Sequence, residues 1–163
     1  MVVGTTSHAG KSLITAAICR LLVRQGFNVT PFKGQNMALN AYITADDREM
    51  GHAQAVQAWA AKIEPRVEMN PILLKPQGDM TSQVIMMGTA VGRVQAADYY
   101  RDYFDRGWAA ITSCLDQLGT EFDYIVCEGA GSPAEINLKH RDLTNMRVAS
   151  YLQANTVLVA DIN

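Results

Sequence analysis

Residues 4–12 read Gly4-Thr-Thr-Ser-His-Ala-Gly-Lys-Ser12. Two glycines followed by a lysine and a hydroxyl residue are typical of a triphosphate-binding loop, although one more residue than usual separates these glycines. Backbone N–H groups of such a loop surround the phosphates, the lysine contacts the outer phosphates and the hydroxyl ligates Mg²⁺. The loop therefore predicts ATP and Mg²⁺ as ligands. The predicted ATP-binding residues are Gly4, Thr5, Thr6, Gly10, Lys11 and Ser12.

The segments on either side of the loop fit the same interpretation. Residues 1–3 are apolar and predict the end of a strand, and a helix is expected to begin near Lys11 and to stop at Gly26. The N-terminus of that helix would point its dipole at the phosphates. The alternative is an accidental turn rich in Gly, Ser and Thr. The apolar face of the predicted helix consists of Leu13, Ile14, Ala17, Ile18, Leu21 and Leu22.

Bulk composition limits the class of protein. A chain of 163 residues with 48% hydrophobic and 18% charged residues predicts one globular domain. The net charge of −2, without a long basic run, argues against a nucleic-acid partner. No apolar run predicts a membrane span or a signal peptide. An odd number of cysteines without metal-type spacing predicts buried free thiols in the cytoplasm: Cys19, Cys114 and Cys127.

Strand-like and helix-like segments alternate along the chain. This order predicts an α/β fold with a doubly wound, mostly parallel sheet between two helical layers. The last two strands are continuous apolar runs, which are typical of strands buried on both faces. Helices are expected over Arg48–Ile63 and Ala96–Leu118. Strands are expected over Val29–Lys33, Ile72–Lys75, Gln83–Met87, Tyr124–Cys127 and Thr156–Ala160.

Acidic and basic residues that follow strands are candidates for the site, because ligands collect at the carboxyl ends of parallel strands. Glu128 follows an apolar strand and predicts a metal-organising carboxylate. Asp46, within the acidic cluster Thr44–Glu49, would complete the Mg²⁺ shell, although such a cluster is also typical of a helix N-terminus. Lys33 ends a strand and would add positive charge at the transferred phosphate. A solvated lysine is the alternative.

Several segments of the sequence resemble segments of known enzyme families. The loop and Glu128-Gly-Ala-Gly131 are similar to those of dethiobiotin synthetase and its relatives, which activate carboxylates with ATP and have a phosphate-loop NTPase fold. Longer segments resemble the cobyric acid synthase family, and together they cover essentially the whole chain. These segments are Pro31–Asn40, Met69–Pro76, Thr81–Val84, Glu128–Leu138 and Asp142–Met146.

The resemblance implies an ATP-dependent amide ligase of cobalamin biosynthesis. The family amidates the b, d, e and g carboxylates of adenosylcobyrinic acid a,c-diamide through acyl phosphates. The implied catalytic residues are Lys11, Lys33, Asp46 and Glu128, and the implied metal ligands are Ser12, Asp46 and Glu128. The implied contacts to the corrinoid are Gln35, Asn36, Gln83, Ser132, Glu135 and Asn137. Lys75, which precedes Pro76, is a further candidate for substrate binding because it could add positive charge as Lys33 would.

The sequence also departs from that family. The family has a C-terminal glutamine amidotransferase domain with a catalytic Cys and His, which is not found here, so this chain is expected to be the synthetase part without glutaminase activity. Ammonia would come from the missing domain. Gly34 stands where many relatives have proline. The alternatives are a switch ATPase of the partitioning or metal-insertion type and an ATP-binding remnant without catalysis. A second lysine early in the loop, common in the switch ATPases, is absent, and a homo-oligomer is left open.

Overall fold

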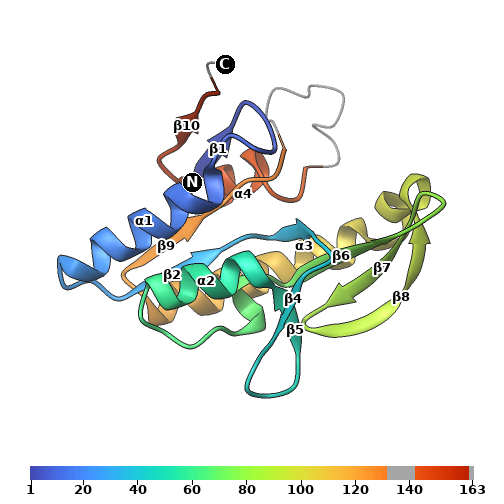
Figure 1. Cartoon of the computed structure of the whole chain (residues 1–163), viewed down its shortest axis with the longest axis horizontal. Coiled ribbons are helices and arrows are strands. Elements are labelled where there is room, and N and C mark those ends of the chain that lie inside the picture. Colours follow the sequence, from blue (N-terminus) through green and yellow to red (C-terminus); the bar gives the residue numbers. More distant parts are fainter. Residues whose placement is uncertain (132–141, 162–163) are drawn as a thin grey trace.

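Helices separate the strands at both ends of the chain, and runs of short strands occupy its middle. The computed structural model describes residues 1–131 and 142–161. Figure 1 shows the elements in chain order. They are β1 (Val2–Gly4), α1 (Lys11–Arg24), β2 (Val29–Phe32), β3 (Gln35–Met37), β4 (Ala41–Ile43), β5 (Glu49–Gly51), α2 (His52–Ala60), a short 3₁₀ helix (Val67–Met69), β6 (Ile72–Gln77), β7 (Thr81–Met86), β8 (Thr89–Gln95), α3 (Ala96–Glu121), β9 (Tyr124–Cys127), α4 (Met146–Tyr151) and β10 (Val157–Val159).

The parallel part of the sheet runs in the order β10, β1, β9, β2. β1 pairs in parallel with β10, and β2 pairs in parallel with β9. A parallel bridge between Val2 and Glu128 joins the two pairs, and the N–H of Gly129 donates to the carbonyl oxygen of Val2 at 2.8 Å. The carboxyl ends of β1, β9 and β2 therefore lie side by side, which is where ligands bind in sheets of this kind.

A second sheet, in the order β3, β6, β7, β8, begins where the chain leaves β2. After Lys33 and Gly34 the chain continues as β3, which pairs in parallel with β6. β6, β7 and β8 then form an antiparallel meander. The predicted mostly parallel α/β fold is confirmed, and the antiparallel strands at one edge follow from the short connections, since a parallel crossover needs a dozen residues or more.

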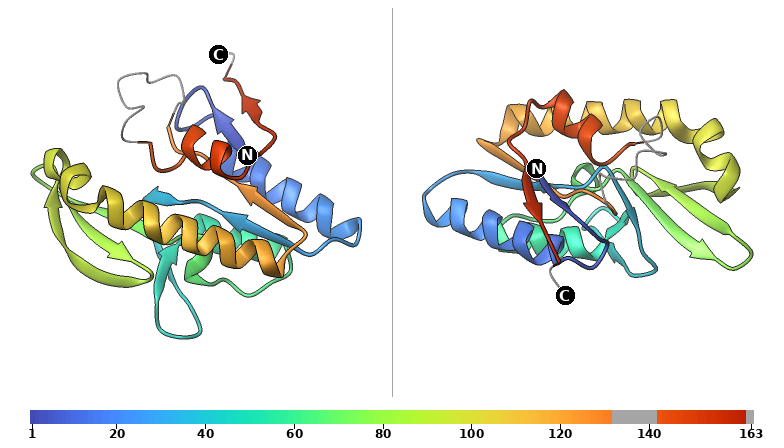
Figure 2. Two further views of the ribbon diagram at one scale, coloured as in Figure 1. Left: turned by 180° about the vertical axis from the view of Figure 1, so that it is seen from behind. Right: turned by 90° about the horizontal axis from the view of Figure 1, so that it is seen from above.

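Two layers of helices cover the sheet. Figure 2 shows α1 and α2 on one face and α3 and α4 on the other, with the strands between them. The core has the same division, because Cys19 of α1 packs with Val29 and Val126, whereas Ile111 and Leu115 of α3 pack on the opposite face. The predicted three-layer arrangement is therefore confirmed.

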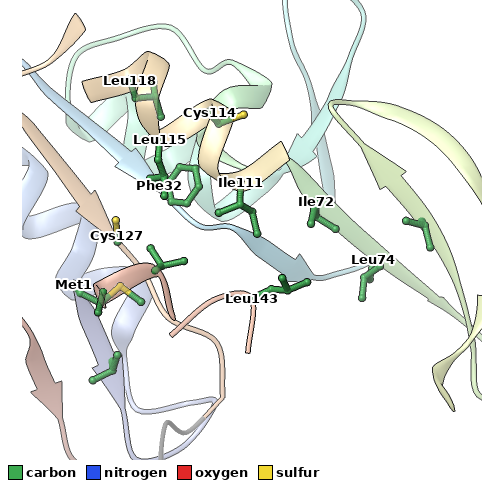
Figure 3. Packing of buried hydrophobic residues seen from close by; sticks show 14 of the residues in the cluster. Met1, Phe32, Ile72, Leu74, Ile111, Cys114, Leu115, Leu118, Cys127 and Leu143 are labelled. Atoms are coloured by element: carbon green, nitrogen blue, oxygen red, sulfur yellow. The ribbon is translucent and has the colours of Figure 1, made fainter. Parts of the chain in front are cut away.

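The largest cluster of buried apolar residues lies between the sheet and α3. Figure 3 shows Phe32, Ile72, Ile111, Leu115 and Leu118 in this cluster. Each of these side chains is at most 1% exposed. Burying one such side chain contributes about 1.5–3 kcal/mol. This packing fixes the end of β2, from which Lys33 enters the site.

The apolar face predicted for α1 is wrong in part. Leu13 is 76% and Leu21 57% exposed, whereas Lys11, Thr15 and Cys19 are buried. The buried positions follow i, i+4, i+8, and Ile18, Leu22 and Val23 pack beside them, so the face toward the sheet is rotated from the predicted one. The predicted ends are confirmed, because α1 begins at Lys11 and Gly26 has a left-handed φ of 94° after its last turn.

Two other predicted segments also differ from the structure. The helix predicted over Arg48–Ile63 begins only at His52, because residues 49–51 pair with β4 as a hairpin strand and bury Met50. The last strand, β10, is not buried on both faces. Val157 is 48% and Leu158 60% exposed, since β10 lies at an edge of the described sheet and pairs with β1. Apolar content alone does not distinguish an edge strand from a central one.

Candidate functional site

The loop between β1 and α1 has the backbone that a phosphate-binding loop needs. Gly10, directly before α1, has a left-handed φ of 92°, which side-chain-bearing residues rarely adopt. A Cβ on Gly4 would meet Cγ of Lys11 at 3.0 Å, so glycine lets the lysine stem pass close to the strand end. Thr5 is exposed, and its N–H donates to the carbonyl oxygen of Val159 at 3.0 Å. The two glycines therefore serve different local needs.

Lys11 is 4% exposed and lies across this loop. Its Nζ donates to the carbonyl oxygens of Thr6 at 2.6 Å and Gly131 at 3.2 Å, and so links the loop to the turn after β9. Burial lowers the pKa of Lys11, the positive charge of Lys33 lowers it further, and the negative charge of Glu128 opposes both. A phosphate beside Lys11 would favour its charged form. The predicted phosphate lysine is thus held at the loop.

Glu128 follows β9 directly and is 2% exposed. Its Oε1 accepts hydrogen bonds from the Ser12 hydroxyl at 2.8 Å and from the Lys33 ammonium at 2.9 Å. Its Oε2 accepts from the side-chain amides of Gln57 at 2.6 Å and Gln54 at 3.4 Å. A buried carboxylate requires such donors to offset its lost hydration. Of the predicted catalytic and metal residues, the structure brings Ser12, Lys33 and Glu128 into direct contact.

The two glutamines of this site were missed by sequence reasoning. Gln54 and Gln57 lie on α2 and are 0% and 1% exposed. Asn36 supports them, because its Nδ2 donates to Oε1 of Gln54 at 3.0 Å. The available signal was the helical spacing of two amides among small apolar residues, since Ala55 and Ala58 are buried on the same helix. A polar residue on the buried face of a helix needs a partner, and here the partner is a carboxylate.

The glycine turn after Glu128 is held by Asn145, which sequence reasoning also missed. The N–H of Ala130 donates to Oδ1 of Asn145 at 3.1 Å, and Nδ2 of Asn145 donates to the carbonyl oxygen of Ala130 at 2.8 Å. Asp142 in turn accepts from the N–H of Asn145 at 2.7 Å. A Cβ on Gly129 would collide with the Asn145 side chain, so glycine is required there. The turn that carries Gly131 to Lys11 is therefore fixed by a side chain from the start of α4.

Comparison with known proteins agrees with this geometry. Residues 1–160 match the family described as the CobQ/CobB/MinD/ParA nucleotide binding domain. The chain belongs to that family. It is 78% identical over 163 residues to the cobyric acid synthase of Acaryochloris marina, 75% to that of Rippkaea orientalis and 73% to that of Synechocystis sp.. Each alignment covers all of this chain and 33% of the relative. The chain therefore spans about a third of the length of these curated relatives.

One residue predicted for the metal of this nucleotide-binding domain lies elsewhere. Asp46 is in the turn between β4 and β5, and Figure 1 shows this hairpin projecting at the opposite end from the loop after β1. Its carboxylate accepts from the Thr44 hydroxyl at 2.5 Å and from Nε of Arg48 at 2.6 Å. The hydrogen bond from Arg48 lowers the pKa of Asp46, with a smaller effect from Thr44. The hairpin pairing therefore places Asp46 apart from Ser12, Lys33 and Glu128, and its catalytic and metal role stays a prediction.

The first two residues predicted to contact substrate lie at the start of β3 and differ in exposure. Gln35 is half-buried, and its Oε1 accepts from the Tyr99 hydroxyl at 2.6 Å. Asn36 is 8% exposed and supports the glutamine pair through Gln54. The corrinoid contact of Gln35 stays a prediction. The corrinoid contact of Asn36 also stays a prediction, and the sequence did not indicate its hydrogen bond to Gln54.

The remaining predicted substrate residues come from β6, β7 and the segment after the glycine turn. Lys75 of β6 forms an ion pair with Glu49, and its cross-strand neighbour on β7 is Gln83. Both side chains are half-buried, and their role toward substrate stays a prediction. Three predicted contacts lie outside the described residues: Ser132, Glu135 and Asn137.

The described thiols and carboxylates provide no second site. All three cysteines are free and buried, as predicted, and burial raises the pKa of Cys19, Cys114 and Cys127 to about 12. Within residues 1–131 and 142–161, no three His, Cys, Asp or Glu side chains gather as metal ligands. No described helix combines the length and apolar character that crossing a membrane requires.

Proposed function

We propose that this chain is the ATP-using part of an amide ligase of the cobyric acid synthase type. The protein would amidate the b, d, e and g carboxylates of adenosylcobyrinic acid a,c-diamide in cobalamin biosynthesis. The observation that carries the proposal is the buried Glu128, which contacts Ser12 of the phosphate loop and Lys33 at once. The identity of 73–78% with cobyric acid synthases over the whole chain supports the choice of substrate.

The chemistry explains why these residues are needed. A carboxylate is a poor electrophile, so an oxygen of the substrate carboxylate attacks the γ-phosphorus of ATP while the bond to ADP breaks. Ammonia then attacks the carbonyl carbon of the acyl phosphate, phosphate leaves, and the nitrogen loses a proton to give the amide. The protein contributes positioning and charge neutralisation in the first step. Lys11 and Lys33 are the cations that would hold the transferred phosphoryl group.

The residues present also fit a magnesium ion. Mg²⁺ prefers oxygen ligands and binds through one or two protein oxygens together with phosphate oxygens and water. The Ser12 hydroxyl and the Glu128 carboxylate are 2.8 Å apart in the structure and come from the loop and the neighbouring strand end. These two groups would hold the metal, which would supply charge neutralisation at the phosphates. Since Asp46 points elsewhere, it has no part in this proposal.

The same proposal includes the source of the ammonia and the cell compartment of the reaction. The curated relatives are about three times as long as this chain, which leaves room in them for a glutamine amidotransferase domain. We place glutamine hydrolysis in such a domain and the ATP-dependent step in this chain. The chemistry of a small water-soluble corrinoid acid, ATP and ammonia fits the cytoplasm.

An ATP turnover assay tests the proposal. Purified protein is given Mg·ATP and an ammonium salt, with or without adenosylcobyrinic acid a,c-diamide, and ADP release is followed together with the mass of the corrinoid. We expect ADP release to rise with the diamide and each amidation to lower the corrinoid mass by the difference between OH and NH₂. The matched control is the corrinoid whose b, d, e and g groups are already amides, which should not stimulate ADP release.

Two outcomes of this assay would contradict the proposal. ADP release that is the same with diamide, with the amidated corrinoid and with neither would indicate an ATPase of the switch type. Binding of ATP without turnover under all three conditions would indicate a nucleotide-binding domain that does not catalyse the reaction.

A further inference from the structure

The side chains of α2 that face Glu128 are two neutral amides. Gln54 and Gln57 are three residues apart on the helix, and both direct Nε2 at the same oxygen, Oε2 of Glu128, at 3.4 Å and 2.6 Å. Both glutamines are at most 1% exposed. Burying an amide is unfavourable unless it is hydrogen-bonded, so packing alone does not favour glutamine at these positions. Their common target indicates a function connected with the carboxylate.

The two oxygens of Glu128 have separate sets of partners. Oε1 accepts from Ser12 and Lys33, the groups that face the nucleotide in the proposed function. Oε2 accepts from Gln57 and Gln54. Because a carboxylate is planar, holding Oε2 from one side fixes the direction in which Oε1 points. The hydrogen bonds from α2 therefore determine the geometry on the side of the loop.

Gln57 makes a second contact that Gln54 does not. Its Nε2 also donates to the backbone oxygen of Ser12 at 3.3 Å, so one amide joins the acid to the backbone of the loop serine. Its Oε1 is buried and has no hydrogen-bond partner among the described residues. An unpaired buried oxygen is unfavourable. The opposite orientation of the amide would place that oxygen against the Glu128 carboxylate, which is less favourable still.

We propose that Gln57, supported by Gln54, is a positioning residue that fixes the Glu128 carboxylate and the Ser12 backbone at the separation a magnesium ion requires. Both glutamines are neutral donors. They hold the carboxylate without cancelling its charge, whereas a third cation beside Lys11 and Lys33 would do so. Partners of this kind orient metal ligands in many proteins. The inference rests on the proposed function, since it assigns the Glu128 and Ser12 oxygens to the metal.

Calorimetric titration of ATP in the presence and in the absence of Mg²⁺ tests this role without requiring turnover. Gln57→Met keeps the length of the side chain and removes the donor. We expect the affinity for Mg·ATP to fall by about 10–100-fold, as for other partners of metal ligands. The affinity for ATP in EDTA should not change, because Lys11 and the loop backbone remain. Gln54→Met should give a smaller loss of the same kind, since its hydrogen bond to Glu128 is longer.

A double-mutant cycle shows whether Gln57 acts through Glu128. In a Glu128→Gln background, Gln57→Met should have little further effect on Mg·ATP affinity, because the group that it positions has lost its charge. A matched control is Gln117→Met on α3, since Gln117 also donates to a glutamate, Glu121 at 3.2 Å, but is exposed. That variant should bind Mg·ATP like the wild type.

Other results would overturn the inference. Equal losses of ATP affinity with and without Mg²⁺, or additive losses in the cycle, would show that Gln57 only supports the packing of α2. If Gln57→Met does not fold, as judged by thermal unfolding, Gln57→Asn withdraws the donor by one methylene and should give the same metal-selective loss. Failure of the proposed function is distinguishable, because it would appear as ATP turnover indifferent to the corrinoid while the metal-selective loss remained.

Discussion

Two acidic residues that each follow a strand have opposite surroundings in this molecule. Glu128 is 2% exposed and receives hydrogen bonds from α1, α2 and the end of β2. The Asp46 side chain is 54% exposed and pairs with Arg48, two residues away in the same hairpin turn. The first acid gathers distant segments, whereas the second completes a local turn.

The strand before each acid accounts for the difference. β9 lies between β1 and β2 in a parallel sheet, so the residue after it emerges where the carboxyl ends of three strands meet. β4 and β5 form an antiparallel hairpin, and the residues between them project away from the sheet. A buried charge pair such as Lys33–Glu128 is costly to break, whereas an exposed pair contributes little. Burial after a parallel strand, and not the density of acids, distinguishes the carboxylate that we propose to be functional.

The largest effect is expected from Lys11→Ala. Lys11 is a buried cation that contacts both the loop and the glycine turn. Its loss removes the positive charge proposed to bind the phosphates and the link between the two segments. We expect ATP turnover to fall on the order of 10³-fold or more. ADP release and ATP titration measure the effect.

The matched control for this variant is Lys62→Ala, because Lys62 is an exposed lysine beyond the end of α2. That variant should behave like the wild type. Unchanged ATP affinity and turnover in Lys11→Ala would contradict the assignment of residues 4–12 as the phosphate loop.

Glu128→Gln is expected to have the next largest effect. The amide keeps the shape of the side chain but removes its charge, so the proposed metal site loses its carboxylate and Lys33 loses its counter-charge. We expect turnover to fall about 10²–10³-fold. The free energy of unfolding should fall by about 3–5 kcal/mol, because Lys33 is left as a buried charge without its partner. Turnover and urea denaturation of the same preparation give the two quantities.

Comparing the loss of turnover with the loss of stability tests whether Glu128 differs in kind from Asp46. A protein that remains folded at 25 °C and has lost its metal-dependent turnover identifies a functional acid. If turnover falls only in proportion to the unfolded fraction, Glu128 is a structural acid and does not differ in kind from Asp46.

The sequence predicted the parts of the site that depend on local pattern. The loop residues 4–12, the start of α1 and the acid after β9 follow from glycine spacing, helix signals and a short apolar run. Gln54, Gln57 and Asn145 were missed because their partners lie 74, 71 and 15 residues away in the chain. The hairpin around Asp46 was not predicted because the acidic segment could also begin a helix, and the pairing of residues 41–43 with residues 49–51 depends on contacts that the local pattern does not show.

Gly129→Ala should have an intermediate effect. A Cβ there would collide with Oδ1 of Asn145, so the turn that carries Gly131 to Lys11 must shift. We expect the free energy of unfolding to fall by about 1–3 kcal/mol, as for other overpacked positions. Turnover should fall by less than for Glu128→Gln, because every charged group remains. Thermal unfolding and ADP release measure both effects.

The control for this variant is Gly119→Ala in α3, where an added Cβ meets no atom within 4 Å. Alanine favours a helix over glycine, so this change should be neutral or stabilising by up to about 1 kcal/mol. If both alanine variants had the same stability and turnover, the hold of Asn145 on the glycine turn would have no role in the site.

The smallest effect is expected from Asp46→Asn, and this variant separates the two acids most sharply. Asp46 contacts Thr44 and Arg48 in an exposed turn, so turnover and its dependence on Mg²⁺ concentration should stay within about threefold of the wild type. Its pKa is lowered in the folded protein, chiefly by the hydrogen bond from Arg48, so any stability that it contributes is present above its ordinary pKa and is lost as the pH falls through the lowered value. The stability difference between wild type and variant should therefore be seen at neutral pH and disappear in acid. A metal-dependent loss of turnover in Asp46→Asn comparable to that of Glu128→Gln would instead require the hairpin to close over the loop during the reaction.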